Sequence, residues 1–112
     1  MIRVKKGVVF KAFRPEILEL IVAITEISIR GGFDIWITSA NDSKHRPNSY
    51  HFEDLAIDLR IRNLSEEELK KLIECLHDLG RYIPQNHEYY DVVLEKDHIH
   101  IEFDMRRFEG EG

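Results

Sequence analysis

Histidine and aspartate occur together at two places in the chain, in a pattern suited to metal binding. His51 precedes Asp58 by seven positions, and His98 and His100 follow Asp97 in the segment DHIH. Two imidazoles and one carboxylate are a suitable ligand set for Zn²⁺, and three protein ligands with an open fourth position are typical of a catalytic zinc site. The alternative is that these are ordinary polar residues on solvent-facing strand surfaces.

Alternating hydrophobicity predicts that these residues project from strands. Between Leu55 and Ile61, apolar residues alternate with a second set that comprises Ala56, Asp58 and Arg60. The segment YDVVLEKDHIHIEF is typical of a hairpin that turns near Lys96-Asp97. Its second strand would place both histidines on the face opposite the apolar residues. Strict pleating would turn Asp97 away from them, so Asp97 must lie in the turn to join the site.

Two further segments have the periodicity of helices. The first begins at Pro15 and ends at Gly31-Gly32, and its apolar stripe comprises Ile17, Leu20, Ile21, Ile24 and Ile27. The second begins with a capping box of Ser65 and Glu68, and Gly80 fits its C-terminal cap. Its apolar face comprises Leu69, Leu72, Ile73, Leu76 and Leu79.

Strands are also expected at 8–10 and at 34–39, and a long polar loop, ANDSKHRPNSY, follows the latter. The predicted fold class is α+β, with a small antiparallel sheet of about four strands and two flanking helices. The 112 residues suit a single domain over 1–112, in which 106–112 would form a frayed tail.

Composition excludes several classes of function. The formal net charge of −5 argues against nucleic-acid binding, which favours basic surfaces. No apolar run approaches the ~20 residues of a membrane span, so stable membrane insertion is not expected. The N-terminal apolar stretch is shorter than that of a signal peptide, which predicts a cytoplasmic location. The single cysteine cannot form an internal disulfide.

The segment SYHFEDLAID resembles the S-x-H-x-x-G-x-A-x-D motif of a family of zinc peptidases. That family includes D-alanyl-D-alanine carboxypeptidases, D,D-dipeptidases and phage L-alanyl-D-glutamate endolysins, and Hedgehog signalling domains share its fold. The segment DHIH resembles the family's second motif, and ITSANDSKHRPNS looks like its strand-and-loop lead-in. The resemblance spans roughly residues 34–103 and implies a Hedgehog-type zinc peptidase fold.

The resemblance implies a role for each matching residue. His51, Asp58 and His100 would be the zinc ligands. Asp97 matches the catalytic acid and base, which would take a proton from water and pass it to the leaving amine. His98 matches the histidine that helps to stabilise the transition state.

Three other positions bear on substrate recognition. Asp54 occupies the glycine position of the motif, a departure that puts the family's substrate preference in doubt more than its metal binding. Arg46 lies where family members present an arginine to a substrate carboxylate, although a solvated loop arginine is an equal alternative. Ser49 matches the motif serine, with a hydrogen bond to substrate or a turn-stabilising role as the alternatives.

The resemblance therefore implies a zinc metallopeptidase that hydrolyses D-amino-acid-containing amides of peptidoglycan stem peptides. A monomer is expected, although the sequence does not determine the oligomeric state. A phage-type endolysin would wait in the host cytoplasm and act on the cell wall after release, whereas a virion-associated enzyme would act at entry. The alternative is a non-catalytic zinc-binding recognition or structural domain. Asp97 and His98 favour the enzyme, because a scaffold requires only the three ligands. The sequence does not identify the bond cleaved, or distinguish an endopeptidase from a carboxypeptidase.

Overall fold

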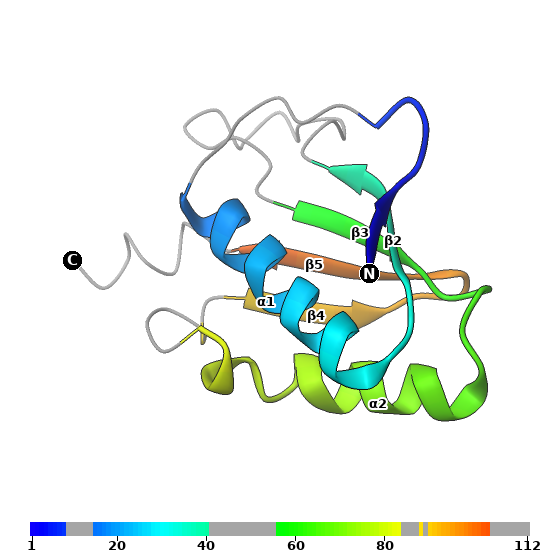
Figure 1. Ribbon diagram of the computed structural model, residues 1–112. Helices are drawn as coiled ribbons and strands as arrows, with labels where there is room; N and C mark the ends of the chain where they lie inside the picture. The colour runs from blue at the N-terminus through cyan, green and yellow to red at the C-terminus, as the bar shows by residue number, and fades with distance from the viewer. Residues whose placement is uncertain (9–14, 41–55, 84–87, 89, 104–112) are drawn as a thin grey trace.

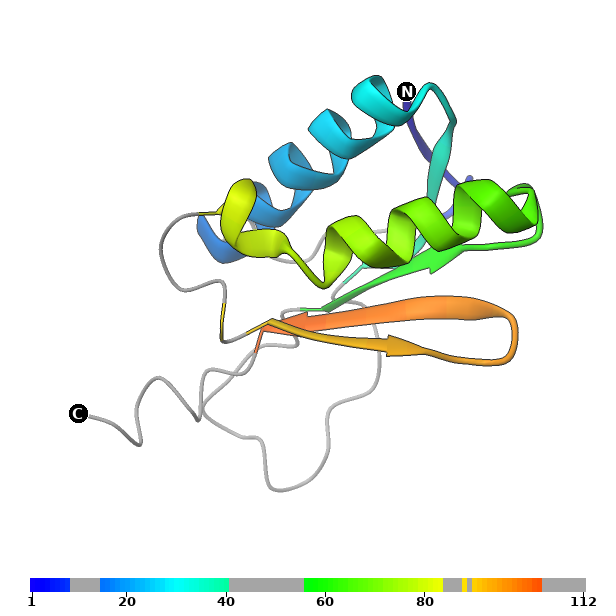
Figure 2. The ribbon, with the colours of Figure 1, turned by 90° about the horizontal axis from the view of Figure 1, so that it is seen from below.

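The computed structural model describes residues 1–8, 15–40, 56–83, 88 and 90–103. These residues form two layers, a mixed sheet and a pair of helices that cover one of its faces (Figures 1 and 2). The sheet comprises β1 Ile2–Val4, β2 Ile35–Ala40, β3 Ala56–Arg60, β4 Tyr90–Leu94 and β5 His98–Phe103. The helices are α1 Pro15–Gly31 and α2 Glu66–Leu76, and a 3₁₀ turn, η1, spans Leu79–Arg81.

The expected α+β class is confirmed, but the prediction of about four antiparallel strands is wrong for the described residues. The sheet has five strands in the order β1-β2-β3-β5-β4, and β1 runs parallel to β2 while the other pairs are antiparallel. The first strand lies at 2–4. Of the strand predicted at 8–10, Val8 lies outside any strand, and 9–10 lie outside the described residues. Three residues are too few to show an alternating pattern, and only Ile2 of the three is partly buried.

The core lies between the helices and one face of the sheet. Helix α1 begins at Pro15 and ends at Gly31 as predicted, and Gly32 adopts the left-handed conformation, with φ 73°, that stops the helix. The largest fully buried side chains are Ile17, Leu20, Ile24, Ile27, Ile35, Ile37, Ile57, Leu59, Leu72, Leu76 and Ile99. Strands β2, β3 and β5 contribute alternate residues over Ile35–Ile37, Ile57–Leu59 and Ile99–Ile101, which leaves the intervening ones on the open face.

Helix α2 has the predicted start but a different end. The Ser65 hydroxyl accepts a hydrogen bond from the Glu68 N–H at 3.1 Å, and the Glu68 carboxylate accepts one from the Ser65 N–H at 3.0 Å. The helix ends at Leu76 with His77 as its cap, so the prediction that Gly80 caps it is wrong. The chain continues through η1, which contains Gly80 and buries Leu79 against the core.

The register of the central strands decides which residues meet on the open face. Asp58 lies directly opposite His100, and Arg60 lies opposite His98. Strands β4 and β5 form the predicted hairpin, and the turn between them contains Asp97. Within the described part of the chain, neither helix has the length and apolar character needed to cross a membrane.

Candidate metal and catalytic site

Two of the three predicted zinc ligands face each other across β3 and β5. The Nδ1 atom of His100 lies 2.7 Å from Oδ1 of Asp58, a hydrogen-bond distance. Both side chains are about one-third exposed, at 33% for His100 and 27% for Asp58, so the pair is reachable from solvent. Residues 42 positions apart in the chain are therefore joined by the strand register.

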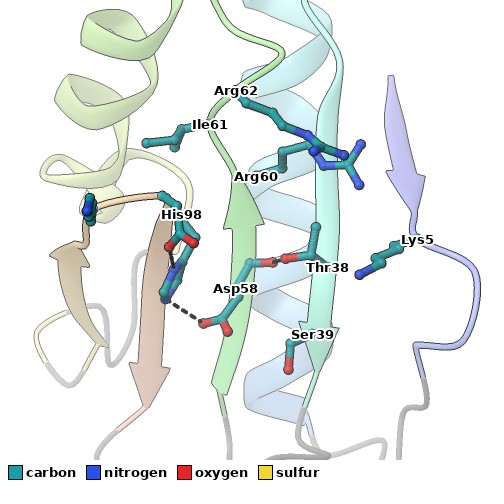
Figure 3. A pocket seen from close by; sticks show the side chains of 10 residues that line it. Lys5, Thr38, Ser39, Asp58, Arg60, Ile61, Arg62 and His98 are labelled. Atoms are coloured by element: carbon teal, nitrogen blue, oxygen red, sulfur yellow. Dashed lines mark hydrogen bonds and ion pairs between the residues drawn. The ribbon is translucent and has the colours of Figure 1, made fainter.

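The two predicted catalytic residues form a second pair at the end of the same hairpin. Oδ1 of Asp97 lies 2.7 Å from Nδ1 of His98, and the Asp97 side chain is 86% exposed. The other ring nitrogen of His98, Nε2, lies 3.9 Å from Oδ1 of Asp58. Figure 3 shows His98 pointing toward Asp58 from the neighbouring strand. The turn position of Asp97 thus lets its carboxylate reach His98, as the sequence required.

The two pairs shift pKa values in opposite directions. The hydrogen bond from His98 lowers the pKa of Asp97, since it stabilises the carboxylate. The hydrogen bond to Asp58 raises the pKa of His100, although partial burial opposes this shift. Glu102 and Glu95 add a weaker attraction for the charged imidazole. The pairing with Asp58 therefore favours the protonated form of His100.

The chemistry of Asp58 and His100 fits part of a zinc site. A carboxylate oxygen and an imidazole nitrogen are both zinc ligands, and two ligand atoms of one tetrahedral zinc lie about 3.4 Å apart. The 2.7 Å separation of Oδ1 and Nδ1 is shorter than this value, so the two side chains would have to move apart by about 0.7 Å to hold one ion. Among the described residues, no group of three His, Cys, Asp or Glu side chains is arranged to hold a metal ion.

The remaining predicted site residues lie outside the described part of the chain. The third predicted ligand, His51, belongs to this group, as do Arg46, Ser49 and Asp54. The expected tail at 106–112 lies outside it as well. The structure thus brings together four of the predicted site residues: Asp58, Asp97, His98 and His100.

A cavity of about 650 Å³ opens beside these pairs and is lined by Asp58, Asp97 and His98. Sequence reasoning missed the basic residues that share its lining: Lys5, Arg60, Arg62 and Lys96. The alternation in β3 places Arg60 on the face of Asp58, which was a usable signal. Lys5 follows the undetected strand β1, so its position could not be inferred from the pattern.

Comparison of the chain with protein-family models, with curated proteins and with solved structures gives no match. The resemblance to zinc peptidases therefore depends on the two motifs, and the assignment of function depends on the chemistry of the site.

Proposed function

We propose that the protein is a zinc-dependent peptidase that hydrolyses D-amino-acid-containing amide bonds of peptidoglycan stem peptides, as a phage-type endolysin does. The observation that carries the proposal is the direct pairing of Asp58 with His100, with Oδ1 and Nδ1 2.7 Å apart. It unites the two motifs that the resemblance requires. The finer assignment of a Hedgehog-type zinc peptidase fold is part of the same proposal.

Asp58 and His100 would hold the ion with His51 as the third ligand. A bound zinc ion supplies a water of lowered pKa and polarises the amide carbonyl. Asp97 would act as the general base, and the hydrogen bond from His98, which lowers the pKa of Asp97, favours the deprotonated carboxylate that this role requires. The same carboxylate then returns the proton to the leaving amine nitrogen.

His98 has two tasks in this scheme. Its Nδ1 fixes the Asp97 carboxylate, which is otherwise exposed and able to rotate freely. Its Nε2 faces the cavity side of Asp58 and would donate a hydrogen bond to the substrate oxygen as negative charge develops there. The cavity provides space for a peptide beside both groups.

The test measures zinc content and peptide release from purified peptidoglycan for the wild type, Asp97→Ala and Asp78→Ala. Asp78→Ala is the matched control, since this exposed aspartate pairs with Arg81 beyond α2, away from the site. We expect about one zinc ion in all three proteins. Cleavage should fall at least about 100-fold in Asp97→Ala alone, the effect expected for loss of a general base.

The other outcomes discriminate among alternatives. Zinc binding without cleavage in any protein would overturn the enzymatic assignment and favour a zinc-binding recognition or structural domain. Absence of zinc from the wild type would refute the ligand set. Cleavage that depends on His100 but not on Asp97 would retain the metal site and reject the assigned base.

A further inference from the structure

Three basic side chains that line the cavity have no acidic partner among the described residues. Lys5, Arg60 and Arg62 line it together. Among the described residues, no carboxylate forms an ion pair with any of them, and the two carboxylates that share the cavity lining have histidine partners. Asp58 pairs with His100 and Asp97 pairs with His98. The protein as a whole carries a formal charge of −5, so this concentration of positive charge runs against its overall balance.

The arginine on β3 is positioned by an aromatic side chain. The guanidinium carbon of Arg60 lies 4.8 Å from the centre of the Trp36 ring on β2, a cation–π distance. Stacking leaves the edge of the guanidinium, with its N–H groups, available for hydrogen bonds. Arg60 is also opposite His98 in the sheet register, so it belongs to the same face as the candidate catalytic pair.

The two other cations approach from either side of Arg60. Arg62 lies two residues after it, just beyond the end of β3, and its side chain extends over β2 in Figure 3. Lys5 follows β1, and its backbone N–H donates to the Ile37 carbonyl at 2.9 Å, which extends the parallel pairing by one residue. Figure 3 shows the Lys5 side chain pointing toward Thr38 from the opposite side.

We propose that Lys5, Arg60 and Arg62 form a binding site for a phosphate monoester group. A phosphate monoester carries a charge of about −1.5 to −2 at pH 7, whereas a carboxylate carries only one negative charge. The phosphate monoester therefore balances three positive side chains better than a carboxylate does. Guanidinium groups match phosphate with paired hydrogen bonds, and the lysine adds a mobile point charge. Neither contribution uses a metal ion, so phosphate binding does not require the proposed zinc ligands, although the cations share the cavity with Asp97 and His98.

The test is titration of the full chain with inorganic phosphate at constant ionic strength, followed by backbone amide shifts in NMR spectra. The variants are Lys5→Gln, Arg62→Gln and Asp58→Asn. Lys70→Gln and Arg81→Gln are the matched controls, because these exposed cations of the α2–η1 region do not line the cavity. We expect shifts at residues of β1, β2 and β3, and a Kd about tenfold higher in Lys5→Gln and Arg62→Gln, as for loss of one charged hydrogen bond.

Acetate, glycerol 1-phosphate and dimethyl phosphate distinguish the ligand chemistry. The monoester should bind more tightly than the diester, and acetate should bind least. Equal binding of acetate and phosphate would overturn the proposal, as would equal effects of Arg62→Gln and Arg81→Gln. Loss of phosphate binding in Asp58→Asn alone would overturn it too, because the anion would then be binding at the metal site rather than at the cations.

Discussion

The two faces of the sheet differ in composition although they belong to the same strands: one is apolar and buried, and the other carries polar side chains that are partly exposed. On the face that α1 and α2 cover, Leu59 and Ile99 lie opposite each other and are fully buried. One position away along each strand, Asp58 and His98 face solvent with about a third or less of each side chain exposed. Since side chains alternate along a strand, residues that are adjacent in the chain lie on opposite faces. One of them stabilises the fold and the other could take part in chemistry. Substitutions on the two faces should therefore have separable effects.

The largest expected effect tests the covered face. Replacement of Ile99 by Ala removes a fully buried side chain from the inner strand β5 and leaves a cavity. We expect a loss of about 2–5 kcal/mol in the free energy of unfolding, the range measured for such truncations. Urea denaturation followed by circular dichroism measures this change.

The neighbouring substitution His98→Ala provides the contrast. It removes a partly exposed side chain with no role in the core, so the free energy of unfolding should change by less than about 1 kcal/mol. Peptide cleavage should fall sharply in His98→Ala. If His98→Ala destabilises the protein as much as Ile99→Ala does, the open face is part of the stabilising structure and the division between the faces is wrong.

The next prediction concerns stabilisation of the folded protein by zinc bound at the open face of the sheet. Any ligand that binds only the folded state stabilises it, by about 2.7 kcal/mol when its free concentration is 100 times its Kd. We expect this increase in the wild type and its absence in His100→Ala. Thermal unfolding with buffered zinc, and again after addition of a chelator, measures the difference.

His77→Ala is the matched control for this experiment. His77 caps α2 and is exposed, so its removal deletes one imidazole without touching the site. An equal loss of zinc stabilisation in His77→Ala and His100→Ala would show that zinc binds nonspecifically to histidines. A zinc effect that survives in His100→Ala would remove this residue from the ligand set.

The covered face was the more predictable of the two. The stripe at Ile17, Leu20, Ile24 and Ile27 located α1, and the capping box located the start of α2, because both signals are local in the chain. Alternation also placed Asp58 and the two histidines on the open face. These inferences need only the period of each element.

The pairing of strands that are distant in the chain was harder to predict from the sequence. Strand β1 has three residues, and its parallel pairing with β2 depends on the path of the chain through α1 rather than on its own pattern. The cationic lining of the cavity requires that pairing, because it brings Lys5 toward Thr38. The end of α2 was misplaced because Gly80 fits a helix cap and a 3₁₀ turn equally well in sequence.

The smallest predicted effect is a pH dependence of stability, which arises because His100 can bind either a proton or the proposed zinc ion. In the metal-free protein, Asp58 raises the pKa of His100, so the folded state holds its proton more tightly than the unfolded chain does. This contribution to stability is fully present below the ordinary histidine pKa of about 6.5 and is lost as the pH rises through the raised pKa of the folded state. Because solvent screens the partly exposed pair, the contribution should be below about 1 kcal/mol.

An NMR titration of the His100 ring measures this shift, and Asp58→Asn should return the pKa toward its ordinary value. With zinc present the dependence should reverse, since a metal ion binds only the deprotonated imidazole and its stabilising effect therefore grows as the pH rises. Opposite slopes in the free energy of unfolding with and without zinc in the wild type, but not in His100→Ala, would identify His100 as a group at which proton and metal compete. A slope of the same sign in both conditions would mean that the proton on His100 and the metal do not exclude each other, and that the ion is held elsewhere.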